Sequence, residues 1–511
     1  MEEKSTMVMD QLTMGMNVPV EIKEKKKELW KNASRFYRIC LIFSVFYVFC
    51  LFDNPIGITY PVFTVGFLTL YQKLMKYEEQ KLKKDSAFYI ISMILLSVST
   101  CLTDNAWIIW FNKIGIWLLF GILVLHNSYE DREWKFTKYL GSMYLFFFHI
   151  IGNFFSAFSH KKLWKTEKDK SRSSQITYIL MGLGISIPLL GVILSLLVSA
   201  DVVFSNLVGR IIYIVFREII IPTKLIRMFL MFLLGFLFFY SLLYCISRKE
   251  LDSEQKDRRS QEPLIAITFL SLIAAVYLIF CGIQISYVFT NGIHLPSGYT
   301  YSTYARQGFF QLLFVCMINL ALVLTCLGLF QENKLLKLLL TFISGCTYIM
   351  IISSAYRMLL YIGAYQLTRL RILVLAALLV LAVLLGGVIR SIYKEKFPLF
   401  KFSTFVVTAV YVILSLSRID AIIASYNISK VGLHITEENQ YITTLSADAA
   451  GIYADAYADC DEVTELAEEK LDCYFGRIRS QKEIGIRNFN LSQYLGKQSA
   501  EQYFDQKMKQ D

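Results

Sequence analysis

The stretch Leu264–Ile285 reads LIAITFLSLIAAVYLIFCGIQI and contains no charged side chain. A helix that crosses the hydrocarbon of a bilayer needs about 20 mainly apolar residues. This stretch is therefore long and apolar enough to span a membrane, and similar runs recur along the chain. They lie at Tyr37–Phe52, Ile56–Tyr71, Ser86–Leu102, Ala106–Leu125, Ile176–Ala200, Ile226–Ile246, Gly308–Phe330, Leu336–Ala355, Ile372–Ile392 and Phe402–Leu416. The runs predict an all-α, polytopic transmembrane helix bundle of about 11 spans, with about 10 to 12 compatible.

The composition supports a membrane protein and argues against a nucleic-acid partner. Of the 511 residues, 55% are hydrophobic and 18% are charged, whereas soluble domains are about 45–50% apolar and about 25% charged. The net charge is +11, but basic residues in a membrane protein mark loops beside anionic lipid. No basic stripe is interleaved with aromatic residues, as a nucleic-acid site requires. We therefore expect the lipid bilayer as a partner and no nucleic acid.

The distribution of basic residues orients the predicted spans, because cytoplasmic loops are enriched in Lys and Arg. The N-terminal segment is basic and is placed inside, as are the loops Lys73–Asp85, His126–Gln175, Ser247–Pro263 and Tyr393–Lys401. About 11 spans from an inside N-terminus leave the C-terminal tail outside the cytoplasm. Four segments are predicted: a cytoplasmic N-terminal segment (1–36), a transmembrane region with basic inner loops (37–175), a transmembrane core (176–417) and a soluble acidic helical tail (418–511).

Two segments do not fit a simple count of spans. Tyr139–Phe158 is apolar but has basic residues on both sides, so we expect a helix that lies in the inner interface or re-enters the membrane. If it spans instead, the count rises to about 12 and the predicted side of the tail changes. Asp201–Pro222 has apolar residues at helical spacing opposite a polar stripe. It is predicted to lie on the outer surface, or else to extend a neighbouring helix.

The tail differs in composition from the rest of the chain. From Arg418 to Asp511 there are 10 Lys and Arg against 16 Asp and Glu. The stretch Asp448–Cys473 is rich in Ala, Glu, Asp and Leu, which favours a pair of helices with an acidic, solvated face. Cys460 and Cys473 either form a disulfide, if the tail is outside, or remain free thiols. The other cysteines lie in or beside apolar runs, and there is no CxxC motif, so no metal or redox site is expected.

Charged residues at membrane depth are costly and are candidates for function. Asp201 follows a predicted span, where it would bind a proton or ion, or else cap the helix that follows. The connection Asn291–Phe309 contains Gly, Pro and several tyrosines and leads to Tyr304 and Arg306. These two residues would receive an anionic or sugar-bearing group. The alternative is a rigid loop whose arginine reaches to lipid phosphates.

A second set of polar residues follows one helix face. Arg357, Tyr361, Tyr365 and Thr368 recur at helical spacing, and Arg371 follows shortly after. Together with Asn319 in the preceding span, they would line a ligand cavity or join helices by hydrogen bonds. The candidate ligand-binding residues are therefore Asp201, Tyr304, Arg306, Asn319, Arg357, Tyr361, Thr368 and Arg371.

The sequence lacks the motifs that define most enzymes. It contains no GxxxxGK[ST], HExxH or GxSxG sequence and no glycine-rich dinucleotide fingerprint. No catalytic residue, metal ligand or cofactor is therefore assigned, and an enzymatic activity is disfavoured.

Five strings occur in an order that resembles a family. They are SADVVF at 199–204, YARQGF at 304–309, SAYRM through LTRLR at 354–371, DAIIASYN at 420–427 and NFNLS at 488–492. Together they resemble a domain-of-unknown-function family of polytopic bacterial membrane proteins, from about Ile176 to about Ser492. The resemblance implies a multi-pass protein of the bacterial cytoplasmic membrane and places Asp201, Arg306, Arg357, Thr368 and Arg371 in the family pattern. It implies no activity, and Gln366 stands where the family pattern has Gly.

Three functions are compatible with these observations. The favoured one is a non-enzymatic envelope sensor or accessory component, whose tail meets a membrane or extracytoplasmic protein partner. The alternative is a transporter or flippase of an envelope metabolite, which fits the helix count and the intramembrane arginines. An envelope-modifying enzyme that uses the Asn291–Phe309 connection is the least favoured.

Overall fold

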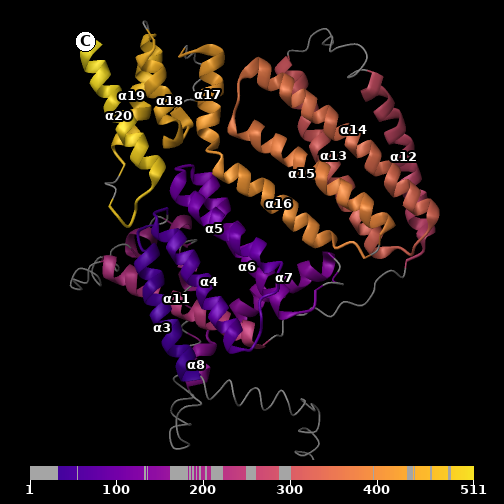
Figure 1. Cartoon of the computed structure of the whole chain (residues 1–511), viewed down its shortest axis with the longest axis horizontal. Helices are drawn as coiled ribbons and strands as arrows, with labels where there is room; N and C mark the ends of the chain where they lie inside the picture. The colour runs from indigo at the N-terminus through magenta and orange to yellow at the C-terminus, as the bar shows by residue number, and fades with distance from the viewer. Residues whose placement is uncertain are drawn as a thin grey trace, which may run out of the picture. The chain divides into compact units, whose positions relative to one another are not determined.

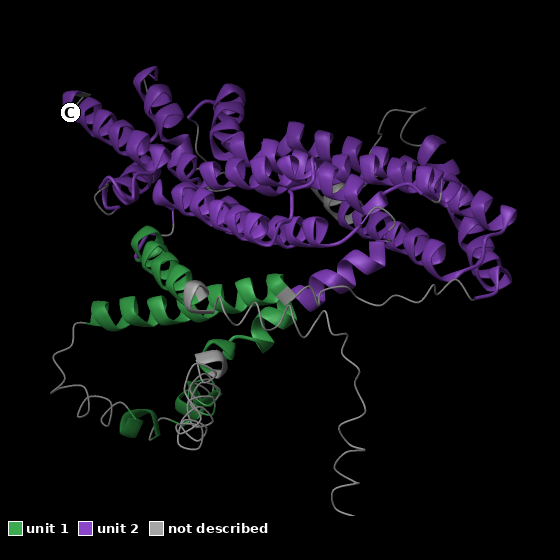
Figure 2. Cartoon of the chain, turned by 60° about the horizontal axis from the view of Figure 1, so that its bottom comes forward, with its two compact units in different colours: residues 1–52, 147–249 green, residues 53–146, 250–511 purple. Residues whose placement is uncertain are grey.

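The computed structural model describes most of the chain between residues 33 and 510. The described residues are 33–54, 56–131, 134, 136–161, short pieces between 182 and 208, 223–248, 261–286, 301–394, 396–433, 441, 443–460, 463–481 and 485–510. The regular structure of these residues is helical, which confirms the predicted all-α class. The chain divides into two compact units, residues 1–52 with 147–249 and residues 53–146 with 250–511 (Figure 2).

Unit 1 contains three named helices among its described residues. They are α3 (Ala33–Leu51), α8 (Ser156–Lys161) and α11 (Thr223–Arg248). Helix α3 packs along α11 through rings, because Phe43 and Phe239 meet edge to face with centroids 4.8 Å apart. The predicted span Ile176–Ala200 and the predicted surface helix Asp201–Pro222 lie largely outside the described residues.

Unit 2 contains most of the apolar helices and the whole described part of the tail (Figure 1). Its first helices are α4 (Thr59–Tyr77), α5 (Ser86–Leu102) and α6 (Ala106–Ser128). They are followed by α12 (Pro263–Ile285), α13 (Tyr301–Leu329), α14 (Lys334–Tyr365), α15 (Arg369–Tyr393) and α16 (Leu399–Leu416). The tail contributes α17 (Ile419–Val431), the short 3-10 helix η5 (Ala447–Ala449), α18 (Ala450–Ala458), α19 (Glu465–Arg479) and α20 (Leu491–Gln510).

Seven helices among the described residues are long and apolar enough to cross a membrane. They are α6, α11, α12, α13, α14, α15 and α16, and two shorter apolar helices lie at Tyr37–Leu51 and Ser86–Leu102. The predicted runs coincide closely with these helices, since the run at Leu264–Ile285 becomes Pro263–Ile285 and the run at Ser86–Leu102 has the same bounds. The multi-pass helical class is therefore confirmed, while the number of about 11 spans stays a prediction.

Helix α14 organises unit 2, because α12, α13 and α15 all pack against it. With 32 residues and a rise of about 1.5 Å per residue, it is about 48 Å long and exceeds the roughly 30 Å of bilayer hydrocarbon. One hydrophobic core continues from this bundle into the tail, and joins Met350 and Leu378 to Ala454 and Phe475. The tail helices thus share a core with the apolar helices, and Figure 1 shows them beside the ends of α5 and α16.

The apolar segment Tyr139–Phe158 is helical but interrupted. Helix α7 covers Phe136–Gly152, and α8 begins at Ser156 after a short turn. The boundary between the two units falls within α7. Whether this segment spans the membrane or lies in the interface stays a prediction.

The turn between α14 and α15 depends on an unusual backbone conformation at Gln366. Its φ of 70° and ψ of 176° fall in a region that is essentially reserved for Gly. Asn427 of α17 supports the turn, because its side chain accepts from the Leu367 backbone N at 2.8 Å and donates to the Leu367 backbone O at 3.0 Å. The glycine that the family resemblance places at Gln366 is therefore the residue that this backbone favours.

Replacing Gln366 by Gly is expected to stabilise the protein by about 1 kcal/mol, because glycine removes the backbone strain at positive φ. The thermal unfolding midpoint of the purified full-length protein in detergent measures the effect. Gln366→Ala is the matched control and should not stabilise, since alanine keeps a Cβ. A midpoint that falls in Gln366→Gly would contradict the strain argument.

Candidate functional site

A buried ion pair joins the tail to the ends of the apolar helices. Asp420, the second residue of α17, has no exposed surface. Its Oδ1 accepts from Arg369 Nε at 2.6 Å and from Asn105 Nδ2 at 3.1 Å. Its Oδ2 accepts from Arg369 Nη2 at 2.6 Å and from the Ser446 backbone N at 2.9 Å. One carboxylate thereby holds the first residue of α15, the residue that caps α6 and the segment before η5.

A second buried carboxylate lies next to the first. Asp448 in η5 accepts from the Thr103 hydroxyl, and its Oδ2 is 3.2 Å from Ser446 Oγ. Arg418 Nε lies 3.5 Å from its other oxygen. Because Thr103 belongs to the connection between α5 and α6, Asp448 ties the tail to the same helix ends as Asp420 does.

The loop before α20 provides further bonds to these ends. Asn490 is fully buried, and its Nδ2 donates to the backbone O of Thr100 at 3.2 Å and of Thr103 at 3.0 Å. In the connection before α4, Asn54 Nδ2 donates to the Arg487 backbone O at 2.8 Å. At Gly57 the chain approaches the backbone of 487–488 so closely that any Cβ would collide with it. Backbone contact of this kind leaves only glycine as a suitable residue.

We call Asp420, Asp448, Arg369, Asn105, Thr103 and Asn490 the tail junction. Asp104 lies beside it and accepts from Gln493 Nε2 at 2.8 Å and Gln481 Nε2 at 3.3 Å, while burial raises the pKa of its carboxyl. The oxygens of Asp420 are all occupied by donors from the chain. The tail junction is therefore arranged to hold segments together. In the described parts of the chain no group of three or more His, Cys, Asp or Glu could hold a metal ion.

Two of the predicted site residues join apolar helices by hydrogen bonds. Asn319 of α13 accepts from Tyr277 of α12 at 2.6 Å and donates to Thr347 of α14 at 2.9 Å. Arg357 of α14 is buried and donates to Gln284 of α12 at 3.2 Å, where Ser353 also donates at 2.7 Å. The polar stripe between α12, α13 and α14 is thus bonded across the bundle.

Three further predicted residues, Tyr361, Thr368 and Arg371, lie around the α14–α15 turn. Arg371 donates to the backbone O of Tyr365 at 2.6 Å and of Gln366, and so satisfies carbonyls at the end of α14. Its guanidinium lies 4.0 Å from the ring centroid of Tyr361. The prediction that Thr368 continues the helix face of Arg357 and Tyr361 is wrong, because α14 ends at Tyr365 and Thr368 is the N-cap residue of α15. Its side chain makes no capping bond. The structure therefore brings Tyr361 and Arg371 together, but Arg357 faces α12 instead.

The other candidates are separate from this group. Asp201 lies in unit 1, is exposed and accepts from the Phe204 backbone N at 2.9 Å, which is the geometry of a helix N-cap. Tyr304 and Arg306 lie in the first turns of α13, and their side chains are outside the described part. Cys460 is half-buried and Cys473 exposed, and both are free thiols.

Another buried carboxylate lies at the opposite end of α6 and was not predicted from the sequence. Asp131 follows α6 and is 2% exposed. It is 2.6 Å from His126 Nδ1 and 3.1 Å from Lys401 Nζ, and it accepts from the Tyr139 hydroxyl. Burial opposes ionisation of Asp131, but these donors outweigh it and lower its pKa to about 2. The signal in the sequence was an acid and a histidine at the end of a span, followed by basic loops.

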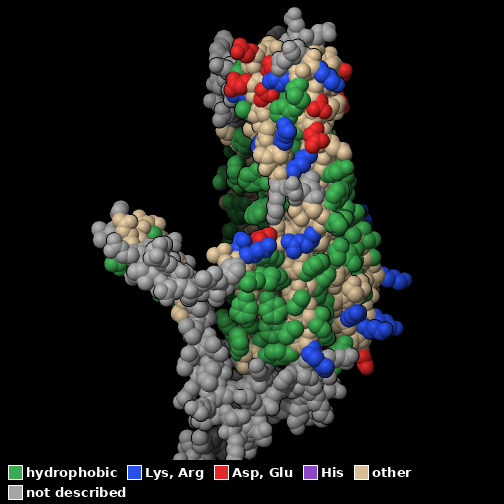
Figure 3. All heavy atoms as spheres, turned by 90° about the vertical axis from the view of Figure 1, so that its left-hand side faces the viewer, with side chains coloured by type: hydrophobic (Ala, Val, Ile, Leu, Met, Phe, Trp, Pro, Cys, Tyr) green, Lys and Arg blue, Asp and Glu red, His purple; other side chains and the backbone are tan. Residues whose placement is uncertain are grey.

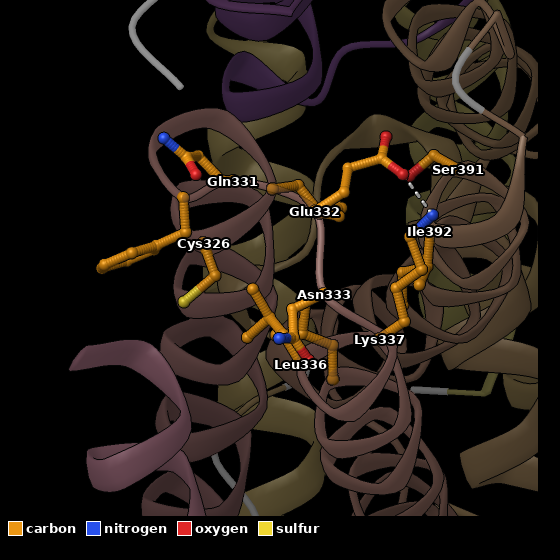
Figure 4. Close-up of a pocket in the computed structure, with 11 residues that line it drawn as sticks. Cys326, Gln331, Glu332, Asn333, Leu336, Lys337, Ser391 and Ile392 are labelled. Carbon is orange, nitrogen blue, oxygen red and sulfur yellow. Dashed lines mark hydrogen bonds and ion pairs between the residues drawn. The ribbon is translucent and has the colours of Figure 1, made fainter. Parts of the chain in front are cut away.

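A small pocket lies at the connection between α13 and α14. Figure 4 shows Gln331, Glu332 and Asn333 from the connection and Ser391 and Ile392 from the end of α15 around it. Glu332 and Lys337 form an ion pair of 2.6 Å beside it. Its volume of about 30 Å³ is roughly that of a water molecule, whereas ligand pockets usually measure about 300–1,000 Å³.

The apolar helices, the basic loops and the tail bonded to the helix ends define a multi-pass helical membrane protein. Within that class, the chain belongs to the family described as "Domain of unknown function (DUF4153)", which matches residues 90–456. This confirms the resemblance to a domain-of-unknown-function family. The matched region contains Asn105, Arg369, Asp420 and Asp448 of the tail junction, and Asn490 lies beyond it. No curated protein and no solved structure matches the chain.

Removing the charge of Asp420 is expected to be strongly destabilising. In Asp420→Asn the guanidinium of Arg369, whose side chain is 22% exposed, loses its anion, which costs up to about 3–5 kcal/mol. Limited proteolysis of the purified protein, with antibodies against the C-terminus, should show earlier cleavage of the tail. The exposed Asp455 gives the control Asp455→Asn, expected within about 0.5 kcal/mol of wild type. Equal resistance of the two variants would show that the tail junction contributes little.

The lowered pKa of Asp131 predicts that the stability of the fold depends on pH. Because the folded-state pKa of Asp131 is lowered to about 2, its ionised form stabilises the fold above the ordinary pKa of about 4. That stabilisation is lost as the pH falls from about 4 towards 2. Asp131→Asn should therefore be less stable than wild type by about 2 kcal/mol at pH 7, and the difference in unfolding midpoint should shrink in acid. A difference that stays constant from pH 7 to pH 2.5 would refute this assignment.

Proposed function

We propose that this protein is a non-enzymatic membrane sensor or accessory component whose tail binds a protein partner and transmits that binding to the membrane helices. The observation that carries the proposal is the tail junction. Buried side chains of the tail bond to the beginnings of α6 and α15 and to the connection before α6. In the connection before α4, Asn54 donates to the tail backbone at Arg487. A tail fixed at four places cannot move without displacing these helix ends.

The chemistry of the junction suits coupling better than catalysis. The ion pair of Arg369 and Asp420, in which both carboxylate oxygens are hydrogen-bonded, has one favoured geometry, and intermediate arrangements leave a charge without its partner. Packed elements of this kind shift between discrete arrangements instead of deforming gradually. A partner that binds the tail more tightly in one arrangement would shift the helices by that difference in affinity.

The exposed residues of the tail indicate the chemistry of the partner that would bind it. Asp455, Glu465, Glu469, Glu501 and Asp505 are all exposed on α18, α19 and α20. In Figure 3 these helices carry the acidic side chains at the top of the view, together with some Lys and Arg. An acidic surface favours a partner with a complementary basic patch and speeds its association at low ionic strength.

Site-directed photo-crosslinking in native membranes tests the proposal. A photoreactive amino acid in place of Glu469 or Asp505 of the full-length protein should capture a protein at near-stoichiometric yield. The same residue in place of Lys394, which is exposed after α15 at the opposite end of that helix from Arg369, is the control and should not capture it. Added salt should lower the yield at the tail positions, since the surface is acidic.

Capture at neither tail position, or equal capture at Lys394, would contradict the proposal. The transporter or flippase would then be favoured, with the buried polar stripe of Arg357, Gln284 and Asn319 as the observation behind it. Loss of flux across a panel of envelope metabolites in vesicles that contain Arg357→Gln would be the corresponding result.

A further inference from the structure

Lys113 is a charged residue inside the apolar helix α6. It stands seven residues after the first residue of α6, which is one of the candidate spans. At about 1.5 Å per residue, its Cα lies about 10 Å along the helix from Ala106. A charge at this depth is costly and calls for a partner.

The surroundings of Lys113 contain aromatic rings but no anion. Its ammonium nitrogen lies 5.5 Å from the ring centroid of Tyr60 in α4. Across the described residues, no Asp or Glu forms an ion pair with Lys113. Lys113 is partly exposed.

The contact with Tyr60 continues a row of contacts between α4 and α6. Phe67 lies 5.5 Å from Trp117 and 4.5 Å from Phe120, and Tyr71 lies 5.4 Å from Phe120, measured between ring centroids. Lys113 and Tyr60 are the members of this row nearest to the tail junction, since Asn105 precedes α6. The contacts between α4 and α6 are therefore between aromatic rings away from the tail junction, and between a cation and a ring at the end nearest to it.

Exposed tryptophans indicate the level of the membrane surface. Trp107 is 65% exposed and Trp110 is 56% exposed, both in the first turns of α6. Tryptophan side chains favour the headgroup region of a bilayer. A lysine side chain on a helix leans towards the N-terminus and can extend its ammonium to that region. The ammonium of Lys113 thus reaches the level of Trp110, where lipid phosphates lie.

Apolar and aromatic side chains share the helix face of Lys113, so a lipid headgroup and its acyl chains could both contact this face. Trp110, Lys113, Ile114 and Trp117 follow one another at helical spacing, and Ile114 is 37% exposed. We propose that Lys113, backed by the ring of Tyr60, binds the phosphate of an anionic phospholipid in the leaflet next to the tail junction. The acyl chains lie along Ile114 and Trp117, below the phosphate.

Photo-crosslinking with lipids tests this site locally. The full-length protein is reconstituted in phosphatidylcholine vesicles that contain a small fraction of phosphatidylglycerol with a diazirine in its acyl chain. After irradiation, peptide mapping should find label on the α6 segment from Ala106 to Trp117. Lys113→Met, which is of similar size and suits an apolar helix, should lower this label about fivefold, because one lysine near the surface contributes about a factor of five in affinity for anionic lipid.

Controls separate the charge from the fold. Lys113→Arg should keep the label, and Lys337→Met should not change it, because Lys337 pairs with Glu332 at the other end of unit 2. Label on other helices of the same Lys113→Met sample reports an intact fold. The proposal is overturned if Lys113→Met keeps full labelling of α6. It is also overturned if diazirine phosphatidylcholine at the same fraction labels this segment as strongly as phosphatidylglycerol does.

Discussion

The bidentate bond between Arg369 and Asp420 is the constraint on which the arrangement of unit 2 depends. The Asp420 side chain has no exposed surface and that of Arg369 is 22% exposed. Taking such charges out of water is favourable only when the remaining donors and acceptors are also satisfied. Here Asn105 and the Ser446 backbone N complete the set on Asp420, while the Thr444 backbone O accepts from Arg369 at 2.8 Å. The starting positions of α15 and α17, the cap of α6 and the path of the tail all follow from this one pair.

At each end of α6, a buried carboxylate accepts hydrogen bonds from several segments of the chain. At its beginning, Asn105 caps the helix through the backbone N of Trp107 and Ile108 and also binds Asp420. Beyond its end, Asp131 collects His126, Tyr139 and Lys401. Helix α16 lies between the same two centres, with Lys401 in its first turn and Arg418 just beyond its end. Between them, Asn112 of α6 accepts from Tyr411 at 2.8 Å and Ser415 at 2.9 Å of α16.

This construction makes the tail an integral part of the membrane bundle. The hydrophobic core is continuous from Met350 in α14 to Phe475 in α19, and the polar bonds of the tail junction surround it. A tail that merely followed the last span would not share its core. The proposed sensor or accessory role uses this continuity, because a partner on the acidic face would act on helix ends that are already fixed to the tail.

The sequence by itself determined the helices of this protein, because hydropathy and helix propensity are properties of consecutive residues. The bounds of α5 and α12 were predictable to within a residue, and the shared helix face of Arg357, Tyr361 and Tyr365 was evident from spacing alone. Only the tertiary structure decided how the polar residues pair. Asp420 meets Arg369 across 51 positions of sequence, and Asn490 meets Thr103 across 387. Arg357 and Tyr361 share a helix face, yet one contacts α12 and the other meets Arg371 of α15. Such pairings depend on which helix ends packing brings together, and no local pattern of residues encodes that.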